Sequence, residues 1–272
     1  MITEENAEET DVSRPSRASR ASLLAALGVF FAGLTLTALL SFWIQKEIVS
    51  SGRTEFNFVY AELRSDIIGR MAANVQVLRS GAALFDSQDE VSRAEWKLFC
   101  ERLRVGDYLP GTQGLGFAAL VPQARLGAHL AEIRGQGFPD YRIYPPDPRP
   151  LYTSIIYLEP FTGRNLRAFG YDMYTDPVRR MAMESARDHN EASLTGRVTL
   201  VQENGLDMQV GTLMYFPVYA RDMPVSTVAE RRLAIRGWVY SPFRMRDFMQ
   251  GALSTWDARL AESRMRLQVY DG

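Results

Sequence analysis

The longest apolar run in the chain lies near its N-terminus and predicts a transmembrane anchor. Residues 21–44 (ASLLAALGVFFAGLTLTALLSFWI) contain no charged side chain. A helix of this length crosses a hydrocarbon core of about 30 Å at about 1.5 Å per residue. The run is longer than the apolar region of a cleaved signal peptide, and it ends on the interfacial residue Trp43. We therefore predict an uncleaved anchor.

The charges beside this run predict its orientation. Arg14, Arg17 and Arg20 precede it, whereas the flank after it holds Lys46 and Arg53 beside acidic residues. The positive-inside rule then places the N-terminus in the cytoplasm and the chain after the span outside the cytoplasm. The span itself is expected in the inner (cell) membrane. Residues 1–20 are rich in acidic and small polar residues, and we expect a disordered cytoplasmic tail.

A helical pattern follows the span and predicts a long helix over residues 45–90. No proline interrupts this pattern, and its apolar positions recur mostly at spacings of three and four residues. These positions are Phe56, Tyr60, Leu63, Ile67, Met71, Leu78 and Phe85. The same stripe suits packing on the chain's own domain or a parallel seam between two copies. We expect a homodimer through this helix, with both uses of the stripe left open.

The start of the next helix is predicted by its capping residues. Ser92 as N-cap and Glu95 three residues later form a capping box, while Val91 and Trp96 have the spacing of a hydrophobic staple. This pattern indicates structure and carries no chemistry.

After Pro110 the chain changes to short strand patterns separated by turn signals, which predicts an α+β fold. Antiparallel sheets are expected because most strands follow one another through short loops, and we place the helices on one side of them. The expected helices are 123–134, 176–188 and 243–256. The expected strands are 114–121, 141–145, 152–159, 167–172, 197–202, 211–219, 235–241 and 266–270.

Composition excludes several classes of function. The net charge of −1 argues against nucleic-acid binding. A single cysteine, Cys100, permits no intrachain disulfide, and His129 and His189 lack metal-ligand spacing. No metal or other cofactor is therefore expected.

No catalytic motif is recognisable either. Gly114 to Ala119 (GLGFAA) fits the letters of a dinucleotide fingerprint, but it leads into a predicted strand, whereas the fingerprint must open a helix. We reject it and expect no enzymatic activity in these 272 residues.

Polar residues on or beside the predicted strands are the candidates for a ligand pocket, because a pocket combines apolar walls with a few convergent polar groups. The alternative for each is a tyrosine that fills the core or an acid that caps a loop. The candidates are Tyr152, Tyr157, Glu159, Asp172, Thr195 and Tyr215.

Asp172 raises this choice most sharply. Asp176 is the better N-cap of the next helix, because Pro177 follows it at the first helical position. Capping therefore leaves Asp172 unexplained. Its carboxylate would contact a ligand or pair with an arginine such as Arg164 or Arg167, and we favour the structural role.

Several segments follow one another in a characteristic order: GLGFAALVP, YLEP, Asn165, FGYD, DPVRRMAMESARD, LTGRVTLVQE, YFPVY and RGWVYSPFR. This succession resembles the CHASE domain, the extracytoplasmic sensory module of membrane-bound histidine kinases, nucleotide cyclases and cyclic-di-GMP enzymes. The resemblance covers residues 56–272.

This resemblance implies that the helix over residues 45–90 is a signalling helix. It also implies a sensor over residues 91–272 with two PAS-like α/β subdomains and a small-molecule ligand in the membrane-distal one. Plant members bind cytokinins. Thr195 matches a threonine at the plant pocket, and Asp172 matches the family's G-Y-D. Glu159 stands in the segment that carries the adenine-contacting aspartate of the plant receptors, and this departure argues against a cytokinin.

The function we expect is the ligand-sensing input of a transmembrane receptor, whose parent is a sensor histidine kinase or a diguanylate cyclase or phosphodiesterase. The sequence ends at VYDG without a second span or an output motif. We therefore expect the sensor part of a longer protein or a truncated product. The alternative is a membrane-anchored structural or scaffold domain without a ligand.

Overall fold

The computed structural model describes residues 17–109, 111–203, 209–253 and 256. The predicted strand 266–270 and most of the predicted tail lie outside these residues. The chain divides into two compact units, Met1–Glu62 and Leu63–Gly272. Helix α1 (Arg17–Ser87) contributes residues to both units, and the rest of the fold belongs to the second.

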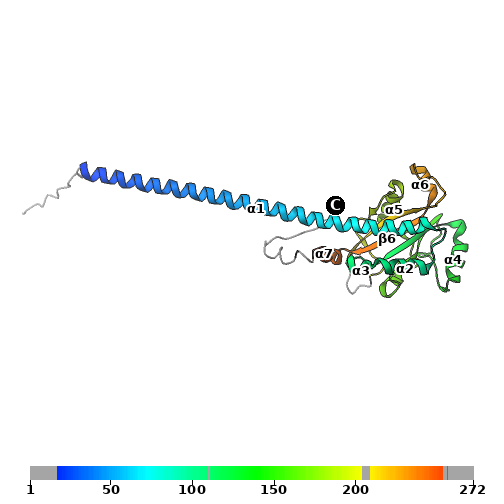
Figure 1. Cartoon of the computed structure of the whole chain (residues 1–272). Helices are drawn as coiled ribbons and strands as arrows, with labels where there is room; N and C mark the ends of the chain where they lie inside the picture. Colours follow the sequence, from blue (N-terminus) through cyan, green and yellow to red (C-terminus); the bar gives the residue numbers. More distant parts are fainter. Residues whose placement is uncertain (1–16, 110, 204–208, 254–255, 257–272) are drawn as a thin grey trace, which may run out of the picture. The chain divides into compact units, whose positions relative to one another are not determined.

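The first unit contains the predicted anchor. Its stretch Leu24–Glu47 is long and apolar enough to cross a membrane, with a mean hydropathy of 2.0. Large apolar side chains such as Phe30 and Trp43 are exposed along it, which suits lipid contact. The N-terminal part of α1 is shown in blue in Figure 1.

The second unit is an α+β domain built on one antiparallel sheet, as the strand patterns predicted. The strand order is β2-β1-β6-β5-β3, and β4 also pairs with β5. The strands are β1 (Leu115–Pro122), β2 (Leu151–Glu159), β3 (Ser193–Leu194), β4 (Val198–Thr199), β5 (Val210–Tyr219) and β6 (Ile235–Arg244). All the described strands belong to this sheet, so the second subdomain implied by the resemblance stays a prediction.

The helices of this unit largely follow the sequence patterns. They are the end of α1, α2 (Arg93–Leu103), α3 (Val105–Tyr108), η1 (Gln123–Arg125), α4 (Leu126–Gly135), α5 (Pro177–His189), α6 (Val228–Ala234) and α7 (Met245–Leu253). The predicted capping box of α2 is confirmed, since Ser92 N–H donates to Glu95 Oε2 at 2.8 Å and Glu95 N–H donates to Ser92 Oγ at 3.2 Å. Helix α6 was not predicted, although Thr227 and Glu230 form a second capping box before it.

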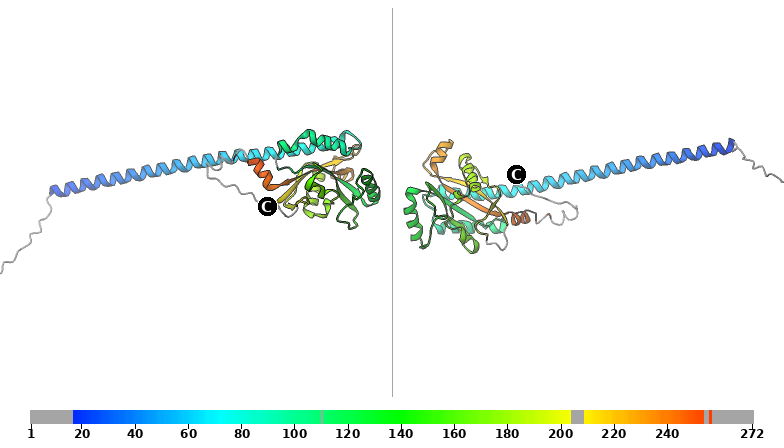
Figure 2. Two further views of the ribbon diagram at one scale, coloured as in Figure 1. Left: turned by 90° about the horizontal axis from the view of Figure 1, so that it is seen from below. Right: turned by 180° about the vertical axis from the view of Figure 1, so that it is seen from behind.

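Helices pack on both faces of the sheet, so the expectation of helices on one side was wrong (Figures 1 and 2). Alternate strand residues separate the two faces. Leu213 and Tyr215 of β5 join a core with α5, whereas Met214 and Phe216 join a core with α1, α2 and α7. The strands are buried on both sides, so alternation between apolar and polar residues does not show how many layers cover them.

Two predicted strands, 141–145 and 167–172, are wrong. Residues 163–168 form the 3-10 helix η2 (Gly163–Ala168), and the backbones of the two segments pair in an isolated bridge between Tyr144 and Tyr171. Gly170 turns the chain there at φ +87°, and a Cβ on it would lie 2.2 Å from the Arg142 carbonyl oxygen. The aromatic side chains of these segments are buried or half-buried where loops fold onto β2, which produces a strand-like pattern without a strand.

Candidate ligand-binding site

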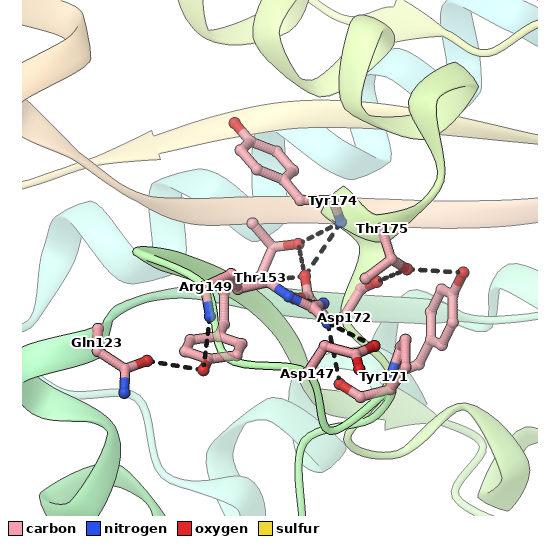
Figure 3. Close-up of polar contacts among 10 residues, drawn as sticks. Gln123, Asp147, Arg149, Thr153, Tyr171, Asp172, Tyr174 and Thr175 are labelled. Atoms are coloured by element: carbon pink, nitrogen blue, oxygen red, sulfur yellow. Dashed lines mark hydrogen bonds and ion pairs between the residues drawn. The ribbon is translucent and has the colours of Figure 1, made fainter.

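Asp172 is fully buried and binds neighbouring segments together (Figure 3). Its Oδ1 accepts hydrogen bonds from Thr153 N–H at 2.9 Å, Thr153 Oγ1 at 2.9 Å and Tyr174 N–H at 3.1 Å. Its Oδ2 accepts one from Arg149 Nη1 at 2.8 Å. The carboxylate thus joins β2, the Arg149 loop and the 3-10 helix η3 (Met173–Thr175), which Asp172 caps.

These contacts change the predicted surroundings of Asp172. Its ion-pair partner is Arg149, rather than Arg164 or Arg167. Asp172 also follows a turn instead of ending a strand. The prediction that Asp176 caps the next helix is confirmed, since its Oδ1 accepts from Val178 N–H at 2.9 Å and from Arg179 N–H at 3.3 Å.

Thr195 is buried at the sheet edge, where its hydroxyl serves the backbone. The Oγ1 atom accepts a hydrogen bond from Leu213 N–H at 3.0 Å and lies 3.1 Å from Thr212 Oγ1. Thr212 in turn donates to the Thr195 carbonyl oxygen at 2.8 Å. This geometry holds the connection between β3 and β4 against β5.

The remaining candidates are divided between the two faces of the sheet. Tyr157 packs on the side of α1 and α2, where its hydroxyl donates to Val91 O at 2.7 Å. Tyr215 packs on the α5 side and donates to Met173 Sδ at 3.2 Å. Glu159 ends β2 and accepts from Phe161 N–H at 3.0 Å. Tyr152 lies in a third core with Tyr141, and its hydroxyl donates to Gln123 Oε1 at 2.7 Å.

The α5 side of the sheet contains tyrosine hydroxyls that lack hydrogen-bond partners. Tyr240 of β6 lies opposite Tyr215 of β5, with ring centroids 6.1 Å apart. The hydroxyls of Tyr240 and Tyr174 are buried without a hydrogen-bond partner among the described residues. Gly116 makes room for Tyr240, since a Cβ there would lie 2.5 Å from the Tyr240 Cε1 atom.

Arg179 brings a positive charge into the same interior. Its Nη2 donates to Thr199 O at 2.7 Å, while its Nε has no hydrogen bond and lies 3.4 Å from Asp176 Oδ2. The guanidinium lies 5.0 Å from the centroid of the Tyr171 ring. Burial raises the pKa of Tyr215 and of Tyr240, a change that nearby Arg179 opposes, so both hydroxyls stay neutral donors.

Tyr240, Tyr174, Arg179 and Arg149 were not among the predicted site residues. Tyr240 lies in RGWVYSPFR and Arg179 in DPVRRMAMESARD, both of which contributed to the family resemblance. Arg179 also stands three residues after its cap, Asp176, a spacing that allows the observed ion pair. The alternation of side chains along the strand could have placed Tyr240 on the opposite face from its neighbours. It could not have shown which face holds the polar groups without hydrogen-bond partners.

The opposite side of the sheet carries a cavity of about 570 Å³, lined among others by Val91, Phe117, Tyr157, His129 and Arg236. His129 lies at 2.9 Å from the Tyr141 hydroxyl, and burial lowers its pKa to about 4. The ring is therefore neutral near pH 7. Among the residues that the structure describes, no group of three or more His, Cys, Asp or Glu side chains could hold a metal ion.

Comparison with known proteins identifies the fold as a sensory one. The family model described as CHASE domain matches residues 89–272, about two thirds of the chain. No curated protein matches the sequence. CHASE domains are extracytoplasmic sensory domains of signalling receptors. With this match over every strand of the sheet and over α2 to α7, the chain belongs to the CHASE domain family.

Proposed function

We propose that this domain binds a small molecule on the α5 side of its sheet and passes the signal to α1. The observation that carries the proposal is the buried, unpartnered hydroxyl of Tyr240 beside Tyr215 and Arg179. Buried polar groups in folded proteins almost always have partners. A ligand that offers hydrogen-bond acceptors would supply the missing ones.

The surrounding groups define the chemistry of such a ligand. Tyrosine hydroxyls and a guanidinium donate hydrogen bonds, so a carboxylate or carbonyl group suits them. The core residues around these groups are aromatic and aliphatic, which favours a ligand with an apolar or planar body. The ligand is therefore a small organic molecule with at least one acceptor group.

Met173 is the residue that we expect a ligand to displace. It is fully buried, and its sulfur accepts the hydrogen bond from Tyr215. A thioether is a weak acceptor on a flexible side chain, so exchange for a ligand oxygen is favourable. Met173 is the first residue of η3 and follows Asp172. Its displacement would therefore move η3, while the hydrogen bonds of Asp172 keep the start of η3 in place.

Strand β6 offers a direct connection from this site to α1. Tyr240 faces the proposed ligand, while its neighbour Val239 packs in the opposite core with Leu78 and Ala82 of α1. Trp256 also donates from Nε1 to Asp66 Oδ2 of α1 at 2.8 Å. A ligand that favours one position of β6 would thereby favour one position of α1.

The cellular setting follows from the anchor and the family. We place the N-terminus in the cytoplasm, the sensor in the periplasm and the span in the inner membrane, because three arginines precede the apolar run. A reporter fused before residue 14 should be active in the cytoplasm, and one fused after residue 272 outside it. The reverse result would contradict this orientation.

The partners proposed are a small molecule, the membrane and a second copy of the chain through α1, without nucleic acid. The parent receptor is a sensor histidine kinase or a diguanylate cyclase or phosphodiesterase. Phe56 and Tyr60 are exposed on α1 and suit a dimer seam, whereas Leu63 is already buried.

Replacing Tyr240 with Phe tests the ligand site, because it removes the unpartnered hydroxyl alone. Small carboxylates and carbonyl compounds would first be screened for an increase in melting temperature of the full chain in maltoside micelles. Tyr240→Phe should weaken binding of a hit by about fivefold, the effect of one hydrogen bond, without lowering the melting temperature of the free protein.

Tyr157→Phe is the matched control, because the Tyr157 hydroxyl is paired and lies on the other face. It should lower stability by about 1 kcal/mol and leave ligand affinity unchanged. If no screened compound stabilises the chain, or if Tyr240→Phe binds a hit as well as the parent, the alternative is favoured: a membrane-anchored structural or scaffold domain without a ligand.

A further inference from the structure

Arg93, the first residue of α2, inserts its guanidinium into a cup of four aromatic rings. The Cζ atom lies 4.5 Å from the centroid of Phe138, 5.1 Å from Tyr157, 5.2 Å from Phe169 and 5.5 Å from Phe161. All four distances lie within the range of about 6 Å over which a ring attracts a cation. We call these four rings the aromatic cup.

The aromatic cup is assembled from three separate stretches of chain. Phe138 follows α4, Tyr157 belongs to β2, and Phe161 and Phe169 flank η2. The three phenylalanine rings contact one another at centroid distances of 5.0–5.8 Å and interplanar angles of 59–90°. Steeply inclined rings of this kind present several faces to one central point, which is the arrangement that cation receptors use.

Arg93 is an imperfect occupant of this cup. Its Nε and Nη2 atoms are buried without a hydrogen-bond partner, and within the described residues it forms no ion pair. Burial lowers the pKa of Arg93, against the opposing influence of Tyr157 and Glu159. Aromatic faces satisfy a positive charge but leave N–H donors unsatisfied, and buried donors without acceptors are destabilising.

We propose that the aromatic cup is a binding site for a quaternary ammonium group, which Arg93 occupies in its absence. A quaternary ammonium carries its charge on methyl groups and has no N–H donor to leave unsatisfied. It therefore gains the attraction of the rings at a lower desolvation cost than the guanidinium, because it leaves no N–H donor without an acceptor. This site is independent of the ligand site at Tyr240, which lies on the other face of the sheet.

The space beside the cup provides the entry path. A cavity of about 780 Å³ is lined by Arg93 and Phe161 together with Glu159, Cys100 and Lys97. Arg93 is half-buried and stands at the end of a flexible stem, so it can move into this cavity when a ligand replaces it. The carboxylate of Glu159 at the same cavity adds negative potential that favours a cation.

Choline is the probe, and its neutral carbon isostere 3,3-dimethylbutan-1-ol is the matched control ligand. Binding to the full chain in maltoside micelles would be measured by titration calorimetry and by thermal shift. Choline should bind and the isostere should not. Arg93→Ala removes the competing guanidinium and should tighten choline binding by about threefold or more.

Variants of the cup separate recognition from packing. Phe161→Leu keeps an apolar side chain but removes one ring, and should weaken choline binding by about fivefold. Lys97→Ala is the control, because this cation lines the cavity but lies outside the cup, so its loss should leave choline affinity unchanged.

The proposal would be overturned by equal binding of choline and the isostere, or by a choline affinity that Phe161→Leu does not change in a folded protein. If Arg93→Ala does not fold, Arg93→Gln replaces it. Absence of choline binding to the wild-type chain and to every folded Arg93 variant would show that the cup only anchors Arg93.

Discussion

Replacing Asp172 with Asn keeps the shape of the side chain and removes its charge, so it tests whether the buried network is structural. The amide oxygen can take the place of Oδ1 and accept from Thr153 and Tyr174. The amide NH₂ then takes the place of Oδ2, where it faces the Arg149 Nη1 donor at 2.8 Å. One charge-assisted hydrogen bond is lost and two donors oppose each other.

The size of the effect follows from the contacts of Arg149. A hydrogen bond to a charged group contributes about 1.5–3 kcal/mol, and removal of one partner of a buried ion pair costs about 3–5 kcal/mol. The Arg149 side chain is 18% exposed and keeps the Pro145 carbonyl oxygen at 3.3 Å. The lower end of the range for a buried ion pair therefore applies, and we expect Asp172→Asn to lower the free energy of unfolding by about 3 kcal/mol.

The assay is urea unfolding of the full chain in maltoside micelles, followed by the fluorescence of the buried Trp96, Trp238 and Trp256. Asp147→Asn is the matched control. Asp147 lies 3.6 Å from the same arginine, but its side chain is 80% exposed. Its replacement should change stability by less than about 0.5 kcal/mol.

A double-mutant cycle assigns the effect to the ion pair. In an Arg149→Leu background, Asp172→Asn should be less destabilising by about 1.5 kcal/mol or more, because the opposing donor is gone. If Asp172→Asn unfolds like the parent and loses affinity for a ligand, the carboxylate is a ligand group and our assignment is refuted.

Three further predictions concern other parts of the chain. Thr195→Val should lower stability by about 1–2 kcal/mol in urea unfolding, because the buried Leu213 N–H loses its acceptor; an unchanged midpoint would contradict this. His129 has a folded pKa of about 4, below its ordinary value of 6.5, so the unfolded chain binds more protons between these values. Stability from this group is complete above pH 6.5 and is lost as the pH falls toward 4, and His129→Asn should reduce that slope; equal slopes would refute the argument. Phe56→Glu should weaken self-association in sedimentation, because Phe56 is 52% exposed on α1, whereas a parent chain that is already monomeric would exclude the seam.

The elements that local chemistry specifies were predictable. The capping box at Ser92 and Glu95 and the cap at Asp176 depend on residues within one helical turn, and both are confirmed. The strand patterns of β1, β2, β5 and β6 came within three residues of their bounds because both backbone preference and apolar content favour them. The segments 141–145 and 167–172 were wrongly predicted as strands, because aromatic residues packed by loops give the same sequence pattern as aromatic residues in a strand.

The candidate site was predictable only in part. Asp172 and Tyr215 were chosen, but the division of Tyr157 and Tyr215 between opposite faces depends on the register of four strands. Tyr157 pairs with Phe117, Phe117 with Val239, and Val239 with Phe216, the neighbour of Tyr215. A shift of one residue in a strand moves its side chains to the other face. Sequence spacing alone does not show where such a shift occurs.

By itself the sequence determined the apolar helix that is long enough to span a membrane, the caps at Ser92 and Asp176, the central strands and membership in a sensory family, because these depend on contiguous residues and their order. Only the tertiary structure decided which side chains meet. Arg149 reaches Asp172 across 23 positions, and Arg93 enters a cup whose rings come from three other segments. Such contacts join residues that are distant along the chain. Their geometry depends on how the loops pack against the sheet, which no local sequence pattern specifies.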